Sequence, residues 1–299
     1  MTNLLDYAHN LTSQAGEDGI IRHIFQVIGS KNKWCCEFGA WDGKHLSNTW
    51  SLINDHQWSS VQIELNKEKF EILEQRYQDR PDVHCLQTAV SKRNSLDKIL
   101  QQTPIPKDFD LLVIDVDGND YWLWKWLNDY QPRVIMVEYN SSMPANLYYL
   151  QDYDFQRCIG VSLRALNSLA KIKGYTLAAG LAGNAIFVRN DEFHKLAIQD
   201  NSVEAMTNTA FVPMLISDLE GHHYLLKVGI YGMTKYEPNN PLHYFSIQNG
   251  KPKGTAELSI TESTFTKKTI SFIKQHRYQR NKKTSQILQQ IKKNKKMKN

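Results

Sequence analysis

The 299-residue chain has no apolar run approaching the roughly 20 residues that a helix needs to cross a bilayer. Its first ten residues include Asp6 and lack a basic-then-apolar pattern, so we expect no secretory signal. The four cysteines show no CxxC spacing. Cys35 and Cys36 are neighbours on one predicted strand and should point to opposite faces. We expect reduced, buried thiols and a cytoplasmic protein.

Acidic residues are missing from the end of the chain. None follows Glu262, although 12 of the 36 Lys and Arg lie between Lys267 and Lys298. The rest of the chain, which precedes Lys267, contains 24 basic and 31 acidic residues and therefore has a net charge of −7. The basic tail can be a solvated end, grip a polyanionic glycan, or lie on an anionic membrane surface at the inner face.

The chain also lacks the G-x-G-x-x-G pattern of dinucleotide-binding turns. It has instead a short apolar segment, residues 34–38, followed by a turn that contains Gly39 and Gly43. About 25 residues past Gly39 a second apolar segment ends in Glu64. Glycine lets the backbone approach a ligand, and an acid at the tip of the next strand can bind both ribose hydroxyls. This spacing predicts a cradle for a ribose-bearing cofactor.

Helix and strand patterns alternate along the first two thirds of the chain. Helical spacing of apolar residues covers 19–27, 45–55, 67–77, 95–101, 121–128 and 162–173. Apolar strand-like runs cover 34–38, 61–65, 83–88, 110–115 and 133–138, and 175–179 and 184–189 read as a hairpin. We therefore predict an α/β, Rossmann-like doubly wound fold with a mostly parallel seven-stranded sheet, an antiparallel edge hairpin and a C-terminal extension.

Three parts follow from these patterns. We expect residues 1–190 to form the α/β domain and residues 191–262 an appended region of weaker pattern. Residues 263–299 would be the basic tail, partly helical or disordered.

Polar residues stand at the carboxyl ends of the predicted strands, where doubly wound folds bind their ligands. Five or six acids at one sheet edge repel one another unless a cation, a metal or many hydrogen-bond donors meet them. A sulfonium cofactor with a positive amino group suits such an edge, and an anionic dinucleotide does not. The polar residues are Glu37, Asp42, Glu64, Asp115, Asp117, Glu138 and Asn140.

Longer motifs make this interpretation more specific. They are SQAGEDG at 13–19, EFGAWDG at 37–43, Glu64, IDVDGND at 114–120, VEYN at 137–140 and LAGNAIFV at 181–188. With these motifs the chain resembles class I S-adenosylmethionine-dependent methyltransferases, and among them it is similar to the FkbM-type branch. The resemblance spans residues 13–189. The turn after residue 38 departs from the richer glycine pattern common in that superfamily, because Ala40 and Trp41 stand inside it.

The resemblance implies roles for single residues. Glu37, Gly39 and Asp42 would hold the methionine end of the cofactor, Glu64 its ribose, and the turn at Ala89 its adenine. Gln14 and Glu17 belong to the first motif, although they can equally just begin the first helix, and Glu64 can be an ordinary strand-end acid. The full cofactor-binding set is Gln14, Glu17, Glu37, Gly39, Ala40, Asp42, Gly43, Glu64, Ala89 and Asp115.

An alcohol that accepts a methyl group must lose its proton, which needs a general base or a metal. We take Asp115, Asp117 and His45 as the catalytic candidates. Oxygen ligands at Asp115, Glu138 and Asn140 are compatible with Mg²⁺. Two alternatives stay open: paired acids beside a cationic cofactor need no metal, and the two aspartates can cap the following helix.

We therefore expect O-methylation of a hydroxyl on a sugar, glycan or related small molecule. Two other functions stay open. A nucleic-acid methyltransferase could use the basic tail, but between Lys267 and Lys298 the only aromatics are Phe272 and Tyr278, and no RNA-binding module precedes the tail. A non-catalytic binding protein on the same fold is disfavoured by the acids at all four strand ends.

Overall fold

The computed structural model describes residues 3–156 and 158–207, and four short strands between residues 214 and 253. The chain splits into two compact units, residues 1–209 and 210–299. In the second unit the four strands form one sheet in the order β11-β10-β9-β8. Their bounds are β8 Met214–Ser217, β9 His223–Leu226, β10 Ser246–Gln248 and β11 Lys251–Lys253. The predicted basic tail, residues 263–299, lies outside the described residues.

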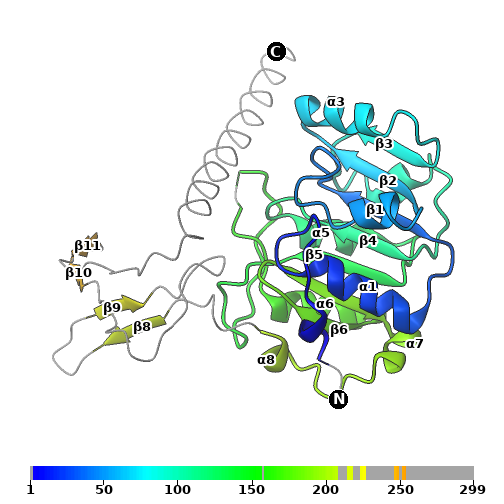
Figure 1. Ribbon diagram of the computed structural model, residues 1–299. Helices are drawn as coiled ribbons and strands as arrows, with labels where there is room; N and C mark the ends of the chain where they lie inside the picture. Colours follow the sequence, from blue (N-terminus) through cyan, green and yellow to red (C-terminus); the bar gives the residue numbers. More distant parts are fainter. Residues whose placement is uncertain are drawn as a thin grey trace, which may run out of the picture. The chain divides into compact units, whose positions relative to one another are not determined.

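The first unit is built on a seven-stranded sheet of order β3-β2-β1-β4-β5-β7-β6 (Figure 1). Strands β1 to β5 pair in parallel, whereas β7 runs antiparallel to both β5 and β6. The predicted Rossmann-like sheet with its edge hairpin is therefore confirmed. The strands are β1 Trp34–Phe38, β2 Ser59–Glu64, β3 Val83–Gln87, β4 Leu111–Ile114, β5 Val134–Glu138, β6 Tyr175–Gly180 and β7 Asn184–Arg189.

Helices cover both faces of this sheet. Side chains from α1, α2 and α3 pack in one buried cluster, and those from α4, α5 and α6 pack in another. The larger helices are α1 Glu17–Ile28, α2 Trp50–Asn54, α3 Lys67–Arg76, α4 Leu96–Leu100, α5 Asp120–Trp126 and α6 Leu163–Lys173. Short turns of helix are η1 Leu4–Tyr7, α7 Asn190–Phe193, η2 His194–Leu196 and α8 Val203–Met206. None of the helices in the described residues combines the length and apolarity that a membrane span requires.

The two clusters explain why the central strands are apolar on both faces. All four residues of β4 are fully buried, two in each cluster. Cys35 packs on the α1 side and Cys36 on the α4 to α6 side, as predicted from their adjacency. Both are free thiols, and burial raises the pKa of each well above its ordinary value. The two cysteines are therefore packing residues of the core.

Local signals set the helix ends. The Asn66 side chain accepts a hydrogen bond from the backbone N–H of Lys69 and so caps α3. Ser162 caps α6 in the same way through the N–H of Ala165. Gly174, with φ of +82°, ends α6 in the left-handed conformation that glycine adopts without strain. These caps fix where the chain enters and leaves the layers beside the sheet.

Candidate active site

The turn after β1 lies against the end of β4. Gly39 has a φ of +91°, and a Cβ atom there would lie 1.9 Å from the carbonyl oxygen of Asp115. No larger residue fits this approach. The backbone N–H groups of Gly39 and Ala40 both donate to the carbonyl of Ile63, at 3.0 and 3.1 Å. The turn is thereby held between β2 and β4, where the strand order reverses.

Glu37, near the end of β1, is 3% exposed. Its carboxylate accepts hydrogen bonds from the hydroxyls of Ser47 and Thr49, both at 2.6 Å, and from the backbone N–H of Asn48 at 2.8 Å. Burial is the largest influence and raises the pKa of Glu37 to about 7, although the three donors act to lower it. Asp115 raises it further by charge repulsion. Glu37 therefore organises the turn behind the sheet edge.

The helix predicted over residues 45–55 is wrong in its first half, because α2 begins only at Trp50. Residues 47–49 instead wrap their donors around the Glu37 carboxylate. A buried acid needs hydrogen-bond partners, and this need outweighs the local helical preference. The signal was present in the sequence as two hydroxyl residues, Ser47 and Thr49, a few positions after the glycine turn. Both were missed as site residues.

Glu64 stands at the tip of β2, next to the β1 turn. Its carboxylate accepts one hydrogen bond from the N–H of Trp41 at 2.9 Å and another from the N–H of Asn66 at 2.6 Å. The side chain is 2% exposed. Each oxygen takes only one of these bonds, which leaves acceptor capacity for a diol. Two backbone donors thus fix the orientation of the acid predicted to bind ribose.

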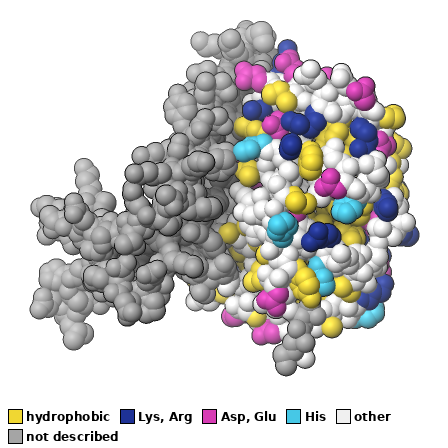
Figure 2. All heavy atoms as spheres, viewed as in Figure 1, with side chains coloured by type: hydrophobic (Ala, Val, Ile, Leu, Met, Phe, Trp, Pro, Cys, Tyr) yellow, Lys and Arg dark blue, Asp and Glu magenta, His cyan; other side chains and the backbone are white. Residues whose placement is uncertain are grey.

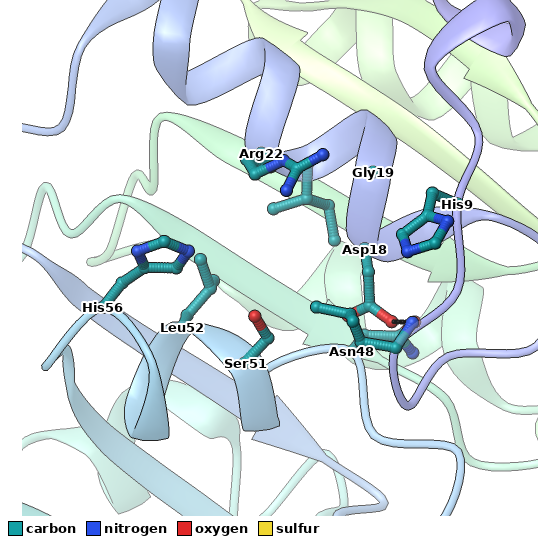
Figure 3. A pocket seen from close by; sticks show the side chains of 10 residues that line it. His9, Asp18, Gly19, Arg22, Asn48, Ser51, Leu52 and His56 are labelled. Atoms are coloured by element: carbon teal, nitrogen blue, oxygen red, sulfur yellow. Dashed lines mark hydrogen bonds between the residues drawn. The ribbon is translucent and has the colours of Figure 1, made fainter.

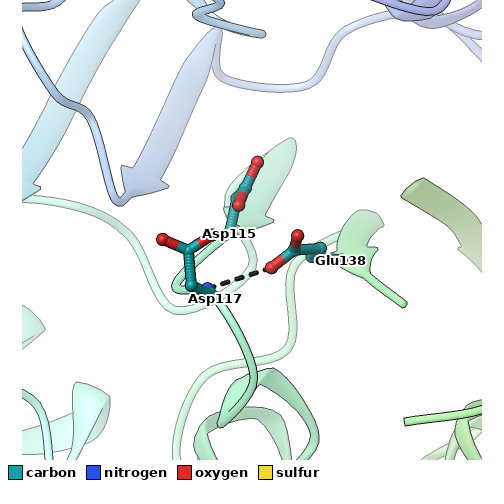
Figure 4. A group of neighbouring side chains, drawn as sticks. All are labelled: Asp115, Asp117 and Glu138. Carbon is teal, nitrogen blue, oxygen red and sulfur yellow. Dashed lines mark hydrogen bonds between the residues drawn. The ribbon is translucent and has the colours of Figure 1, made fainter. Parts of the chain in front are cut away.

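Three acids from the ends of β4 and β5 come together. Asp115, Asp117 and Glu138 can each bring one carboxylate oxygen within 4.8 Å of the others (Figure 4). The backbone N–H of Asp117 donates to Glu138 at 2.9 Å. All three side chains are half-buried. Because like charges at this spacing repel, the group favours a cation, a proton or further donors.

Asp117 and Asp120 shape the turn that follows β4. Asp117 has a φ of +61°, which is uncommon for a residue other than glycine. The buried Asp120 carboxylate accepts from the N–H groups of Val116 and Gly118 at 2.8 and 2.9 Å. Burial first, and then Asp115, raises the pKa of Asp120 to about 8. The N-cap position of α5 is occupied by Asn119, so neither Asp115 nor Asp117 is the N-cap residue of this helix.

Asp42 and His45 lie in the β1 turn. The Asp42 carboxylate accepts from the N–H groups of Lys44 and His45, at 3.0 and 2.7 Å. Burial alone would raise the pKa of Asp42, but these bonds and the nearby Arg76 outweigh it and lower the pKa. Gly43, with φ of +76°, closes the turn against α3. His45 is half-buried beside Asp42.

The first motif reaches across the sheet edge to β7. Glu17 is fully buried and accepts hydrogen bonds from the N–H of Ala15 at 2.6 Å and from the Asn184 amide at 3.0 Å. Asn184 is paired with Glu138 in the sheet register. Gln14, one turn earlier, is exposed. The sequence signal for Asn184 was its place in the closing motif, but its contact with Glu17 was missed.

Ala89 and Asn140, which follow β3 and β5, make local hydrogen bonds of their own. Ala89 is exposed just past β3, which pairs with β2, and its carbonyl accepts from Asn94 at 2.8 Å. The Asn140 amide oxygen accepts two hydrogen bonds from Ser142, at 3.0 and 2.5 Å. Its acceptor capacity is thereby used. Among the residues described at this edge, Asp117 is therefore better placed than Asn140 to complete a set of oxygen ligands with Asp115 and Glu138.

A shallow pocket opens between α1 and α2 on one side of the sheet (Figure 3). His9, Arg22 and His56 surround it, and the buried Asp18 carboxylate accepts three backbone N–H groups at 2.8 to 2.9 Å. None of the predicted site residues lines this pocket. On the face drawn in Figure 2, acidic, basic and histidine side chains are interspersed among apolar ones. This face differs from the basic stripe typical of nucleic-acid binding.

No family model and no curated protein match the chain. Solved structures do match. An O-methyltransferase from Bacillus cereus in complex with SAH is 17% identical over 61% of this chain and 83% of its own, with a TM-score of 0.40. A SAM-dependent methyltransferase from Aquifex aeolicus is 11% identical over 56% and 87%, with a TM-score of 0.35. The N-terminal domain of EvdMO1 with SAH bound is 12% identical over 58% and 80%, with a TM-score of 0.37. At such identities the likeness concerns the fold alone.

Proposed function

We propose that the protein is an S-adenosylmethionine-dependent methyltransferase that acts on a hydroxyl of a sugar, glycan or related small molecule. The observation that carries this proposal is the gathering of carboxylates at the carboxyl edge of β1, β2, β4 and β5. Strand ends at the switch point of a doubly wound sheet are its usual ligand site. Anionic side chains there match a cationic ligand and oppose an anionic one.

The residues present fit this cofactor. Glu64 is held in place by two backbone donors and retains acceptor capacity for the two ribose hydroxyls. The β1 turn at Gly39 comes too close to the residue after β4 for any side chain, so no side chain at this position covers the backbone of the turn at the carboxyl edge of the sheet. The half-buried Asp115 provides negative charge beside it. When bound, the cofactor supplies an electrophilic methyl group on a positively charged sulfur.

The chain's own task in such a reaction is to align the acceptor and take up its proton. We assign the role of accepting the hydroxyl proton to Asp115 or Asp117, and His45 is the other candidate. A base of this kind typically contributes about 10²–10⁴-fold. Mg²⁺ is the second way to acidify the hydroxyl, and Asp115, Asp117 and Glu138 would be its ligands.

Isothermal titration calorimetry with S-adenosylmethionine and its demethylated product tests the cofactor assignment. We expect saturable binding, and a loss of about tenfold or more in Glu64→Ala, because two hydroxyl contacts disappear. Glu71→Ala is the matched control, since Glu71 is an exposed acid on α3 that forms an ion pair with Lys67 of the same helix. Absence of saturable binding to the unmodified protein would refute the proposal.

A further inference from the structure

The shallow pocket between α1 and α2, which we call the α1–α2 pocket, contains a buried polar atom without a partner among the described residues. Asn48 lines this pocket and is 5% exposed, and its side-chain oxygen Oδ1 accepts no hydrogen bond from any residue that the structure describes. Ser51, which is 8% exposed, lines the pocket as well. Unpaired buried polar atoms are rare in folded proteins, and water or a ligand usually satisfies them. The buried side of the pocket therefore requires a hydrogen-bond donor.

Three side chains around the opening of this pocket can donate hydrogen bonds to an anion (Figure 3). His9 precedes α1, Arg22 belongs to α1, and His56 follows α2. All three are exposed, and none forms an ion pair with another residue in the described part of the chain. Figure 2 shows histidine and basic side chains close together over α1. Guanidinium and imidazole N–H groups bind the oxygens of phosphate and carboxylate groups, so this rim favours an oxyanion.

One acid also lines the pocket, but its charge is already stabilised by the backbone. The Oδ2 atom of Asp18 accepts the N–H groups of residues 11–13 at 2.8 to 2.9 Å. These three bonds offset the repulsion between Asp18 and a bound anion. The backbone of His9 is held in the same segment, because its N–H donates to Gly16 at 3.2 Å and its carbonyl accepts from Gly19 at 2.9 Å. The rim of the pocket is thus fixed to the start of α1.

The donors of the rim and the acceptor of the floor together specify the chemistry of the ligand. The rim requires oxygen acceptors, whereas Asn48 Oδ1 requires a donor on the ligand. Hydrogen phosphate has both near neutral pH, because it keeps at least one P–O–H group. A phosphate ester of a polyol has both as well, because its free hydroxyls can donate. Sulfate has the same tetrahedral shape, but it is fully ionised and has no hydrogen to donate.

The α1–α2 pocket lies behind the β1 turn and is joined to it through Asn48. The backbone N–H of Asn48 donates to Glu37 at 2.8 Å, while its side chain lines the pocket. The Thr12 hydroxyl donates to the carbonyl of Ser47 at 2.9 Å and ties the rim segment to the same turn. None of the strand-end acids lines the pocket, so its ligand is neither the proposed cofactor nor the methyl acceptor.

We infer that the α1–α2 pocket binds a small oxyanion that also carries a hydroxyl donor, either hydrogen phosphate or a polyol phosphate ester. This site is separate from the carboxyl edge of the sheet. The inference goes beyond the proposed function and holds whether or not the strand-end acids bind S-adenosylmethionine.

An NMR titration of the isotope-labelled full chain with inorganic phosphate, glycerol phosphate and sulfate tests the inference. We expect saturable shifts of the Gly19 and Ser51 amide signals, with a dissociation constant of about 1 mM or lower for phosphate or its ester. Sulfate should bind about tenfold more weakly, because Asn48 Oδ1 stays unpaired beside it. The amide signals of Glu64 and Asp117 should not move. The tighter of the two phosphate probes identifies whether the free ion or the ester is the ligand.

Two variants separate the rim from the floor. Arg22→Gln removes an exposed cation and should weaken phosphate binding about tenfold without changing the melting temperature. Asn48→Ala removes the unpaired acceptor and keeps the N–H that donates to Glu37, so phosphate and sulfate should then bind with equal affinity. Lys171→Gln is the matched control, because it removes the same charge from an exposed position on α6 and should leave phosphate binding unchanged.

Several results would overturn the inference. Absence of saturable shifts with both phosphate probes would mean that water alone satisfies Asn48. Shifts at Glu64 and Asp117 instead of Gly19 and Ser51 would place the anion at the strand ends. Equal losses of affinity in Arg22→Gln and Lys171→Gln would reveal general attraction by surface charge. Sulfate binding as tight as that of phosphate in the unmodified protein would show that the site requires no hydroxyl donor.

Discussion

Gly39 and Asp115 lie in van der Waals contact across the β1–β4 junction, with no room between them for a single carbon atom. A Cβ at position 39 would meet the Asp115 carbonyl oxygen at 1.9 Å. Asp115 is the first residue after β4, and its N–H donates to Phe38 at 3.0 Å. The glycine therefore positions the Asp115 backbone as well as the turn that precedes Glu64.

This contact predicts that Gly39→Ala is severely destabilising. Alanine at this position would have to adopt a positive φ and would displace the neighbouring backbone. Together these two effects should lower the free energy of unfolding by about 3 kcal/mol or more. The melting temperature should fall by roughly 6–12 °C. Gly29→Ala is the control, because Gly29 also has a positive φ, +71°, but nothing lies within 4 Å of its Cβ position. Equal effects of the two substitutions in thermal melts would show that the contact with Asp115 is not what requires glycine.

The fold was predictable because its signals are local and repeated. The central strands are apolar on both faces, as β4 shows. In helices α1, α3 and α6 the apolar residues recur at helical spacing and form one face. The adjacency of Cys35 and Cys36 was enough to place them on opposite faces. Alternation of such segments leaves few topologies for a parallel sheet.

The site was predictable only in part, because its contacts join residues distant in sequence. Strand-end acids follow from the pattern, so the grouping of Asp115, Asp117 and Glu138 was foreseen. The donors on Glu37 come from a turn that reads as helix, and Asn119 contacts Asp154 across 35 positions. Such contacts depend on the path that each loop takes in the folded protein, and the periodicity of the sequence does not indicate this path.

Glu37 should make stability depend on pH between about 4.5 and 7. Its pKa in the folded protein is about 7, above its ordinary value of 4.5, so the folded state binds more protons than the unfolded state in this range. The free energy of unfolding therefore falls as pH rises from 4.5 to 7 and levels off above it. The contribution of Glu37 is at most about 3 kcal/mol. Urea unfolding at pH 4.5, 6 and 7.5 measures it.

Glu37→Gln is the variant that isolates this effect. Glutamine can accept from the Asn48 N–H and donate to the Ser47 and Thr49 hydroxyls, but it does not titrate. Asp120, whose pKa is also raised, titrates in both proteins and cancels in the comparison. We expect a smaller fall of stability with pH in the variant. Identical pH profiles would mean that folding does not raise the pKa of Glu37.

Arg133→Met should destabilise the protein without affecting the site. Arg133 is 4% exposed and pairs with the fully buried Asp110 at 2.8 Å and with Glu192 at 2.7 Å, at the amino end of β5. Removing it leaves Asp110 without its cation, at a cost of about 3–5 kcal/mol. Arg189→Met, which breaks an ion pair to the exposed Asp191, should cost less than about 1 kcal/mol. Urea unfolding checks both, and an Arg133 effect no larger than that of Arg189 would contradict the argument.

Treatment with EDTA should leave methyl transfer unchanged. Asp115, Asp117 and Glu138 can converge on a cation, but the positively charged cofactor that we propose beside Asp115 would balance these acids without a metal. The measurement is product formation by protein dialysed against EDTA, with and without added Mg²⁺. Loss of activity that Mg²⁺ restores would assign the three carboxylates to metal binding.

Asp117→Asn should then abolish most of the activity while preserving the site. Asparagine adopts a positive φ more readily than most residues, so the turn at φ +61° is retained, together with the N–H that donates to Glu138. An amide cannot take up the acceptor's proton, so we expect kcat to fall about 10²–10⁴-fold, with unchanged affinity for the demethylated cofactor. His45→Gln serves as the comparison for the other candidate base. If His45→Gln lowers kcat by this factor and Asp117→Asn does not, the proton passes to the imidazole of the β1 turn, and the carboxylates at the ends of β4 and β5 act only through their charge.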